Sequence, residues 1–455
     1  MDSTSGQVTA GRAAAGGAPQ TLLSVPDGMF LVIGMVIGVG IFKLPSLVAG
    51  NTTGEAQFLF AWLLGGAVSL CGALVYAELS SRHPETGGEY TFLRRALGDG
   101  AAFLFVWSRM TVIQTGVIVA VAFAFGDYAS EVLRLGEKSS AVWAAASVVA
   151  LTALNVVGTF SSKTLQKAME IALIAALVLV SIAALVIGGN PKPAAAGSGG
   201  SISAFGLAMV FVLFTYGGWN EAAYLAGEVR DARRNMLKIL VAGIVAVTAL
   251  YLLVNLAYLS TLGMGGVRES KAVAADVMRQ LAGEKGVVLI ALVVCVSALT
   301  TMNAAIFTGA RTTWAFAQDY PLFARLGAWR TQGSTPANAL VLQGFISLLL
   351  VWAASYTRDG FQAMVDYTAP VFWIFFLLTG VTLFVFRSRG GETPAVRTPL
   401  YPLVPLVFVL MCAYMIYSTV SYALADYGPK FGNMVLTGIV VMVAGIPLYF
   451  LARRK

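Results

Sequence analysis

Glycines at positions 34, 38 and 40 interrupt an apolar stretch near the N-terminus, VIGMVIGVGIFKLP (residues 32–45). Glycine destabilises a helix interior by about 1 kcal/mol relative to alanine, so this spacing predicts a helix that unwinds partway along. In lipid, the backbone groups freed by unwinding must each find a partner. The N–H groups that start a half-helix suit a carboxylate, and the carbonyls that end one suit an ammonium group or another cation. The stretch therefore indicates a binding site made of backbone atoms.

A second apolar stretch, FGLAMVFVLFTYGGWNEAAYLAGEVRD (residues 205–231), carries Gly217 and Gly218 midway along its length. Glycine interruptions at corresponding positions of two halves of a chain are the best sequence indication of a substrate site in an inverted-repeat transporter. The alternative is that these small residues only let neighbouring helices pack closely. Two clusters in matching helices favour the substrate site.

The elements that must position these breaks are membrane helices. The 455-residue chain is 58% hydrophobic and 11% charged, with a mean hydropathy of +0.79, whereas soluble proteins carry about 25% charged residues. Apolar runs long enough to cross a bilayer predict an all-α membrane protein of twelve spans. The expected limits are 28–50, 57–80, 100–130, 140–158, 166–188, 203–228, 237–262, 286–317, 337–356, 361–386, 401–424 and 432–452.

Basic clusters orient the predicted spans. Pairs such as Arg94-Arg95 and Arg387 with Arg389 fall in alternate loops, which places both termini in the cytoplasm. Residues 1–24 are small and polar, lack a signal peptide, and are expected to form a disordered tail. The basic residues are dispersed over separate loops, so the net charge of +8 indicates contact with anionic lipid and excludes a nucleic-acid partner.

The chain has little material for catalysis or metal binding. Its three cysteines (Cys71, Cys295 and Cys412) fall in predicted spans and are expected to be small buried hydrophobes, and His83 is its single histidine. No HExxH or GxSxG motif is present, so an enzyme is not expected.

Four segments resemble the amino acid–polyamine–organocation transporters. GVGIF (residues 38–42) is similar to their G-S-G-I-F signature, with Val39 in place of serine. FTYGGWNEAAYLAGEVRDARRNM (214–236) resembles their aromatic-glycine-tryptophan segment. HPETGGEYTFLRRALG (83–98) and MNAAIFTGARTTWAFAQD (302–319) resemble a cytoplasmic loop and the eighth span. The motifs occur in the family's order, which identifies the superfamily but not a substrate.

The resemblance implies a leucine-transporter-like fold of two inverted five-helix repeats (residues 25–190 and 200–388), with helices one and six discontinuous. Two peripheral helices and a short basic tail occupy residues 400–455. It implies a substrate carboxylate on the amides of Val39, Gly40 and Ile41. The amino group would then meet carbonyls at Phe214, Thr215 and Tyr216, with Tyr216 and Trp219 gating or lining the side-chain pocket.

Three coupling modes stay open. In cation-independent relatives a lysine on span five follows a glutamine by about seven residues, but counting from Gln166 reaches Leu173 here, and Lys167 and Glu170 lie nearer the cytoplasm. Sodium-coupled relatives instead use hydroxyls on span eight and carbonyls on span one. The matching set is Gly34, Ile37, Ser297, Thr300 and Thr301, so a sodium ion is a candidate coupling ion, beside a proton or uncoupled exchange. No other cofactor is expected.

Charged residues at predicted cytoplasmic helix ends could form an inner gate or a solvated surface: Glu78, Glu228, Arg230, Arg311 and Asp319. Arg109, with Gln114 following it, lies within span three, where an ionisable side chain is either functional or extends to the interface. Asp366 is expected to cap span ten. Glu221 is the candidate for proton coupling.

The sequence thus predicts a secondary active transporter of neutral L-amino acids in a bacterial inner membrane, working by alternating access. The alternatives are a proton-coupled symporter, an uncoupled amino acid or amine exchanger, a channel, and a substrate sensor. The aromatic and small residues around the second break favour a neutral cargo. The sequence indicates no oligomeric state.

Overall fold

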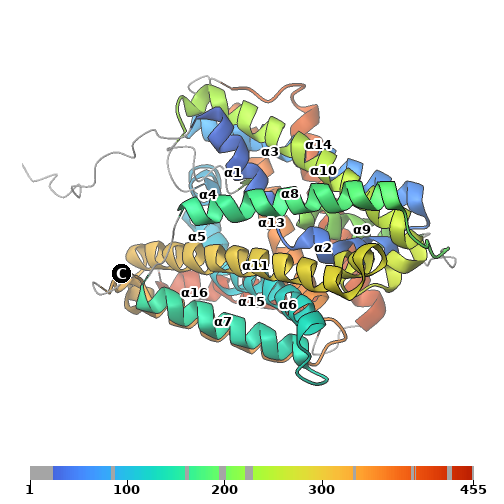
Figure 1. The fold of residues 1–455 in the computed structure, drawn as a ribbon. Coiled ribbons are helices and arrows are strands. Elements are labelled where there is room, and N and C mark those ends of the chain that lie inside the picture. The colour runs from blue at the N-terminus through green and yellow to red at the C-terminus, as the bar shows by residue number, and fades with distance from the viewer. Residues whose placement is uncertain are drawn as a thin grey trace, which may run out of the picture.

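The computed structural model describes residues 24–83, 88–158, 163–193, 201–220, 229–330, 335–390, 394, 396–427 and 433–452, and these are helical almost throughout (Figure 1). The α-helices are α1 (Val25–Val36), α2 (Gly40–Gly50), α3 (Glu55–Arg82), α4 (Gly88–Leu97), α5 (Asp99–Ser108), α6 (Gln114–Val132), α7 (Ser139–Val157), α8 (Lys163–Ile187), α9 (Ile202–Thr215), α10 (Ala232–Glu269), α11 (Val273–Asp319), α12 (Ala337–Ala354), α13 (Gly360–Arg389), α14 (Leu403–Tyr427), α15 (Met434–Val443) and α16 (Gly445–Ala452).

Among the described residues, ten helical segments are long and apolar enough to cross a membrane. The pair α1 and α2 passes the same test together, bent by 53° at a short break, which brings the number of candidate spans to eleven. Helix α9 is a shorter apolar helix, and the part of the predicted sixth span that follows it, residues 221–228, lies outside the described residues. The prediction of a polytopic all-α membrane protein is confirmed.

Two segments that the sequence predicts as loops are helical. The predicted loop 263–285 instead holds the end of α10 and the start of α11, which bend at Gly263 (φ 68°) and Gly283 (φ 63°). Glycine adopts this left-handed conformation without strain, so the chain turns sharply while its neighbours stay helical. Loop 83–98 contains α4, which buries Phe92 and leaves Arg94 exposed. Its buried positions lie on one face of an amphipathic helix.

The predicted third span is not a uniform helix. Between α5 and α6 lies a π-helical turn over Arg109–Ile113, and all five of its residues are buried. A π-turn inserts one residue into the helix and often occurs at functional sites. In α6 the Gln114 side chain donates to the backbone carbonyl of Ala305 in α11 at 2.8 Å, which ties the third span to the eighth.

Small residues let the helices around the two breaks approach closely. An ideal Cβ at Gly65 in α3 would lie 2.3 Å from Val212 of α9, and one at Gly66 would lie 2.4 Å from Thr248 of α10. Such small-residue contacts drive helix association where water exclusion cannot. Helices α8, α11 and α7 run side by side across the face shown in Figure 1, with α2 and α9 behind them.

Candidate substrate site

The first break separates α1 from α2. The Gly38 N–H donates to the Val36 carbonyl at 2.9 Å instead of reaching Gly34, four residues back, as a continuous helix would require. In the described part of the structure, the N–H groups of Val39, Gly40 and Ile41 have no acceptor. An ideal Cβ at Gly38 would meet no atom within 4 Å there. The break therefore presents three free donors at the start of α2.

The second break follows α9. This helix ends at Thr215, and the Gly217 N–H turns back to the Phe214 carbonyl at 3.1 Å. Gly218 then takes a φ of 113°, which residues with a Cβ rarely adopt. The last carbonyls of α9 accordingly lie at the negative end of a half-helix.

The two breaks touch each other. An ideal Cβ at Gly40 would lie 3.2 Å from the Thr215 methyl group and 3.3 Å from the Thr215 Cα. An ideal Cβ at Gly218 would lie 2.4 Å from the Met35 carbonyl oxygen, which is a backbone atom. Glycine is therefore needed at Gly218, the contact at Gly40 is tight, and the free donors of α2 lie beside the carbonyl end of α9.

Aromatic side chains pack behind the breaks. The Tyr216 hydroxyl donates to the Trp62 carbonyl at 3.0 Å, and the Tyr216 ring meets the Tyr251 ring edge-on at 5.0 Å. Trp219 packs against Tyr76 at 5.0 Å and is almost fully buried. Both predicted gating aromatics thus contact the bundle interior in this conformation. Of the residues predicted to bind substrate (Val39, Gly40, Ile41, Phe214, Thr215, Tyr216 and Trp219), the structure shows Gly40 in contact with Thr215, while Trp219 packs against Tyr76, Phe376 and Phe408.

The candidate sodium ligands are less closely assembled. The Thr300 hydroxyl donates to Val296 in its own helix at 2.9 Å, and it lies 3.4 Å from the Met169 sulfur of α8. Within the described residues, no hydrogen bond joins Ser297, Thr300 or Thr301 to Gly34 or Ile37. The Glu170 carboxylate instead lies against Gly34, where an ideal Cβ would be 2.5 Å from its Oε2.

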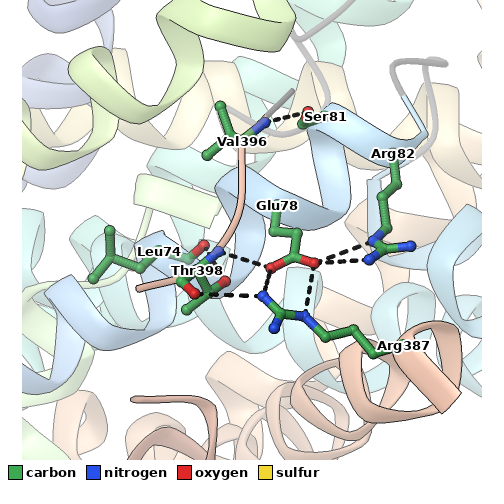
Figure 2. A network of polar contacts seen from close by, with 7 residues as sticks. All are labelled: Leu74, Glu78, Ser81, Arg82, Arg387, Val396 and Thr398. Atoms are coloured by element: carbon green, nitrogen blue, oxygen red, sulfur yellow. Dashed lines mark hydrogen bonds and ion pairs between the residues drawn. The ribbon is translucent and has the colours of Figure 1, made fainter. Parts of the chain in front are cut away.

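A buried carboxylate joins three segments at one end of the bundle. Glu78 of α3 is fully buried and accepts from Arg82 Nη2 and from Arg387 Nε of α13, each at 3.0 Å. It also accepts from the Thr398 N–H at 2.8 Å (Figure 2). The Thr398 hydroxyl in turn donates to the Leu74 carbonyl at 3.1 Å. These residues (Glu78, Arg82, Arg387 and Thr398) are called the Glu78 cluster.

The other residues predicted for an inner gate do not join this cluster. Asp319 accepts from the Tyr90 hydroxyl of α4 at 3.2 Å, and the Arg311 guanidinium lies 3.2 Å from the centre of the Phe307 ring. Arg230 is exposed. Glu228 and Glu221 lie outside the described residues. Among the predicted gating residues, then, only Glu78 has a buried ion pair with another helix in the described part of the chain.

The sequence analysis missed a second ion cluster. The Lys43 ammonium of α2 is buried and lies 2.8 Å from Asp127 of α6 and 3.1 Å from Asp359, the N-cap of α13. It also donates to the Lys271 carbonyl at 3.2 Å. Lys43 lies within the predicted span 28–50, and a charged residue inside a membrane span is by default a candidate functional residue, so the sequence could have indicated this cluster. These residues (Lys43, Asp127 and Asp359) are called the Lys43 cluster.

The cluster also corrects the predicted role of Asp366. Asp359 caps α13 by accepting from the Gln362 N–H at 3.0 Å, whereas Asp366 is buried almost two turns inside the helix. Burial alone would raise the pKa of Asp359. The neighbouring Lys43 ammonium and the backbone N–H groups of Gln362 and Phe361 outweigh burial and hold this pKa below its ordinary value.

A bundle of apolar spans, with two helix breaks in contact, defines an integral membrane protein with an intramembrane polar site. The chain belongs to the amino acid permease family, whose family model matches residues 23–445. Members of this family are transporters and not enzymes, as the sequence predicts.

Three relatives span nearly the whole chain. The serine/threonine exchanger SteT of Bacillus subtilis (strain 168) is 26% identical over 429 residues, covering 93% of this chain and 95% of the relative. The b(0,+)-type amino acid transporter 1 of Mus musculus is 27% identical over 437 residues, covering 93% and 86%. The cystine/glutamate transporter of Homo sapiens is 25% identical over 434 residues, covering 93% and 83%.

Proposed function

We propose that this amino acid transporter exchanges neutral L-amino acids across the membrane by alternating access, at a site between the two helix breaks. The observation that carries the proposal is the contact between Gly40 and Thr215. It places the free N–H groups of α2 next to the carbonyl end of α9. An α-amino acid carries a carboxylate and an ammonium group on one carbon, so it complements both ends at once.

The chemistry of the surrounding side chains limits the cargo. The substrate carboxylate would bind the amides of Val39, Gly40 and Ile41, and the ammonium group the carbonyls of Phe214 and Thr215. Because Val39 supplies no hydroxyl, recognition of the carboxylate depends on backbone donors alone. The aliphatic Val39 and the aromatic Tyr216 and Trp219 offer no charge to a substrate side chain, which supports a neutral amino acid.

Alternating access requires closures on both sides of the site. Asp359 of the Lys43 cluster caps the start of helix α13 and Arg387 of the Glu78 cluster lies in its last turn, roughly 40 Å apart at 1.5 Å per residue. The Lys43 cluster joins the start of α13 to α2, which begins at the first break. The Glu78 cluster joins the end of α13 to α3, which packs against α9. The Lys43 cluster would act as the outer closure and the Glu78 cluster as the inner one, with both termini in the cytoplasm of a bacterial inner membrane.

The fold would be two inverted five-helix repeats with α1–α2 and α9 as the discontinuous members. The bent pair, the ten long spans and the short α9 support a total of twelve spans. Exchange is favoured over ion coupling because the relative SteT is named a serine/threonine exchanger. Sodium coupling through Gly34, Ile37, Ser297, Thr300 and Thr301 stays a prediction.

Counterflow in proteoliposomes tests the proposal. Vesicles loaded with an unlabelled neutral L-amino acid should accumulate the same labelled amino acid without any ion gradient. Sodium and proton gradients are then imposed separately, and Thr301→Ala is the matched variant for the sodium arm. Binding of amino acids without counterflow would identify a sensor instead. Uptake that requires sodium, and that Thr301→Ala abolishes, would replace exchange with sodium symport.

A further inference from the structure

A single tyrosine hydroxyl joins the ends of the two half-helices. Tyr251 of α10 is fully buried, and its hydroxyl oxygen lies 2.9 Å from the Val36 carbonyl oxygen and 3.0 Å from the Thr215 carbonyl oxygen. Val36 is the last residue of α1 and Thr215 the last of α9. A phenol has one hydrogen, so Tyr251 donates to only one of the two carbonyls at any moment.

The position of this hydroxyl matters because both carbonyls lie at negative helix ends. A buried carbonyl without a donor is destabilising, and more so where a half-helix dipole ends. The Thr215 carbonyl is also one that the proposed function assigns to the substrate ammonium group. Tyr251 therefore occupies a hydrogen-bonding position that the cargo requires.

A second buried group on the same face of α10 lacks a donor. Asn255 follows Tyr251 by one turn, and Tyr258 follows by two, so the three share a face. Tyr258 reaches the Ile41 carbonyl of α2 at 3.4 Å, which shows that this face is turned toward the first break. Asn255 Nδ2 donates to the Tyr251 carbonyl at 2.7 Å, but in the described structure its Oδ1 has no partner. A ligand with several donors would satisfy both Asn255 and the carbonyls.

We propose that Tyr251 is a positioning residue that takes the place of the substrate ammonium group in the empty carrier. Its hydroxyl holds the Val36 and Thr215 carbonyls together when no cargo is present. When an amino acid binds, the ammonium group takes over the Thr215 carbonyl and Tyr251 keeps the bond to Val36. This inference rests on the proposed function, and it explains how a carrier with two open helix ends can return empty, which in an exchanger is slower than return with cargo.

The test compares Tyr251→Phe with Tyr128→Phe. Tyr128 is equally buried and donates to the Phe42 carbonyl at 3.0 Å, inside α2 and beyond the break. Tyr128→Phe therefore removes one buried hydroxyl that donates to a backbone carbonyl, as Tyr251→Phe does, but away from the two helix ends. Two rates are measured in proteoliposomes with a labelled neutral amino acid: counterflow, and efflux into substrate-free buffer, which requires the empty carrier to return. Thermal unfolding of each variant is followed in parallel.

Without its internal competitor, Tyr251→Phe should bind the amino acid more tightly, with KM for counterflow reduced about tenfold, equivalent to about 1.4 kcal/mol. Efflux into substrate-free buffer should slow by more than counterflow does, because the empty carrier must move with unsatisfied carbonyls. Tyr128→Phe should leave both the KM for counterflow and the ratio of efflux to counterflow at the parental values. An unchanged or raised KM in Tyr251→Phe, or the same changes in Tyr128→Phe, overturns the inference while counterflow by the parent protein still supports the proposed function. If the parent exchanges no amino acid, both fail.

Should Tyr251→Phe not fold, infrared difference spectra of the parent protein give the answer. Adding a neutral amino acid should shift a tyrosine C–O band, since the hydroxyl then donates to the Val36 carbonyl alone instead of alternating between two carbonyls. Addition of the matching 2-hydroxy acid, which lacks the ammonium group, should leave that band in place. A spectrum without a tyrosine band that depends on the amino acid overturns the inference.

Discussion

Gly218→Ala is the substitution that acts most directly on the contact between the two breaks. Gly218 adopts a φ of 113°, and an added Cβ would lie 2.4 Å from the Met35 carbonyl oxygen and 2.9 Å from the Met35 carbonyl carbon. These are backbone atoms, so they cannot move aside as the end of a flexible side chain could. Alanine at this position must push the end of α1 away from the segment after α9.

Two terms give the magnitude. Holding a residue with a Cβ in a sparsely populated backbone conformation costs about 1–3 kcal/mol. Overpacking in a close-packed interior adds about 1–3 kcal/mol. The sum, about 2–6 kcal/mol, compares with the roughly 1.4 kcal/mol that changes an equilibrium tenfold. The carrier should therefore lose its substrate-binding geometry even where the bundle still folds.

The assay is counterflow of a labelled neutral amino acid, together with the thermal unfolding midpoint. Gly50→Ala is the matched control, because Gly50 ends α2 without a positive φ and an added Cβ would meet nothing within 4 Å. Gly218→Ala should lower counterflow at least tenfold, and Gly50→Ala should retain it. Parental KM and maximal rate in Gly218→Ala would refute the argument that these two backbones meet at the site.

Three further predictions concern the ion clusters. Lys43→Met leaves two carboxylates without their cation, so the unfolding midpoint should fall by the equivalent of about 3–5 kcal/mol, and Lys43→Arg should recover part of the loss; equal midpoints for parent and Lys43→Met would contradict this. Glu78→Gln removes the carboxylate that Arg387 and the Thr398 amide share, and it should lower the midpoint and the counterflow rate together, whereas a variant with both parental values would exclude Glu78 from the inner closure. Because the pKa of Asp359 lies below its ordinary value, its contribution is fully present above about pH 4 and is lost only as pH falls further. In Lys43→Met, burial acts without the ammonium and raises the pKa of Asp359, so the midpoint difference between parent and variant should be largest near pH 8 and should shrink as pH falls toward 5; a difference that stays the same across this range would contradict the assignment.

The sequence predicts the helix breaks because their cause is local. Glycine weakens a helix wherever it occurs, and both interruptions fall at glycines, Gly38 with Gly40 and Gly217 with Gly218, although Gly65 and Gly66 stay inside the continuous helix α3. The structure adds what no local rule supplies, namely that the breaks touch. That contact depends on how α1, α2 and α9 pack together, which follows from the whole bundle.

The ion clusters show the opposite case. Lys43 stands out in an apolar span, but its partner Asp359 lies more than 300 residues away, and pairing of that kind depends on tertiary packing. Glu78 was predicted as a gate residue, yet its partner Arg387 was read only as an orienting loop charge. Tyr251 gave no sequence signal, because a tyrosine in an apolar helix is ordinarily a packing residue and only the structure places its hydroxyl between two carbonyls.

The helical segments around Gly263 and Gly283 were predicted as a loop for a related reason. Charged residues within 263–285 resemble a solvent-exposed connection, whereas Val267, Val273 and Val277 are buried against the bundle. The overall composition of residues 263–285 does not separate the charged residues from the buried valines, so it does not reveal a helix with one buried face. Burial of one face stabilises short helices that intrinsic propensity would not.

The most direct test of the account is an experimental structure of the protein in lipid nanodiscs with a neutral L-amino acid bound. The account predicts density between the two breaks, with the ligand carboxylate within hydrogen-bond distance of the Val39, Gly40 and Ile41 amides and its ammonium group at the Thr215 carbonyl. An amino acid bound elsewhere in the bundle, or α1 and α2 running on as one continuous helix, would contradict it.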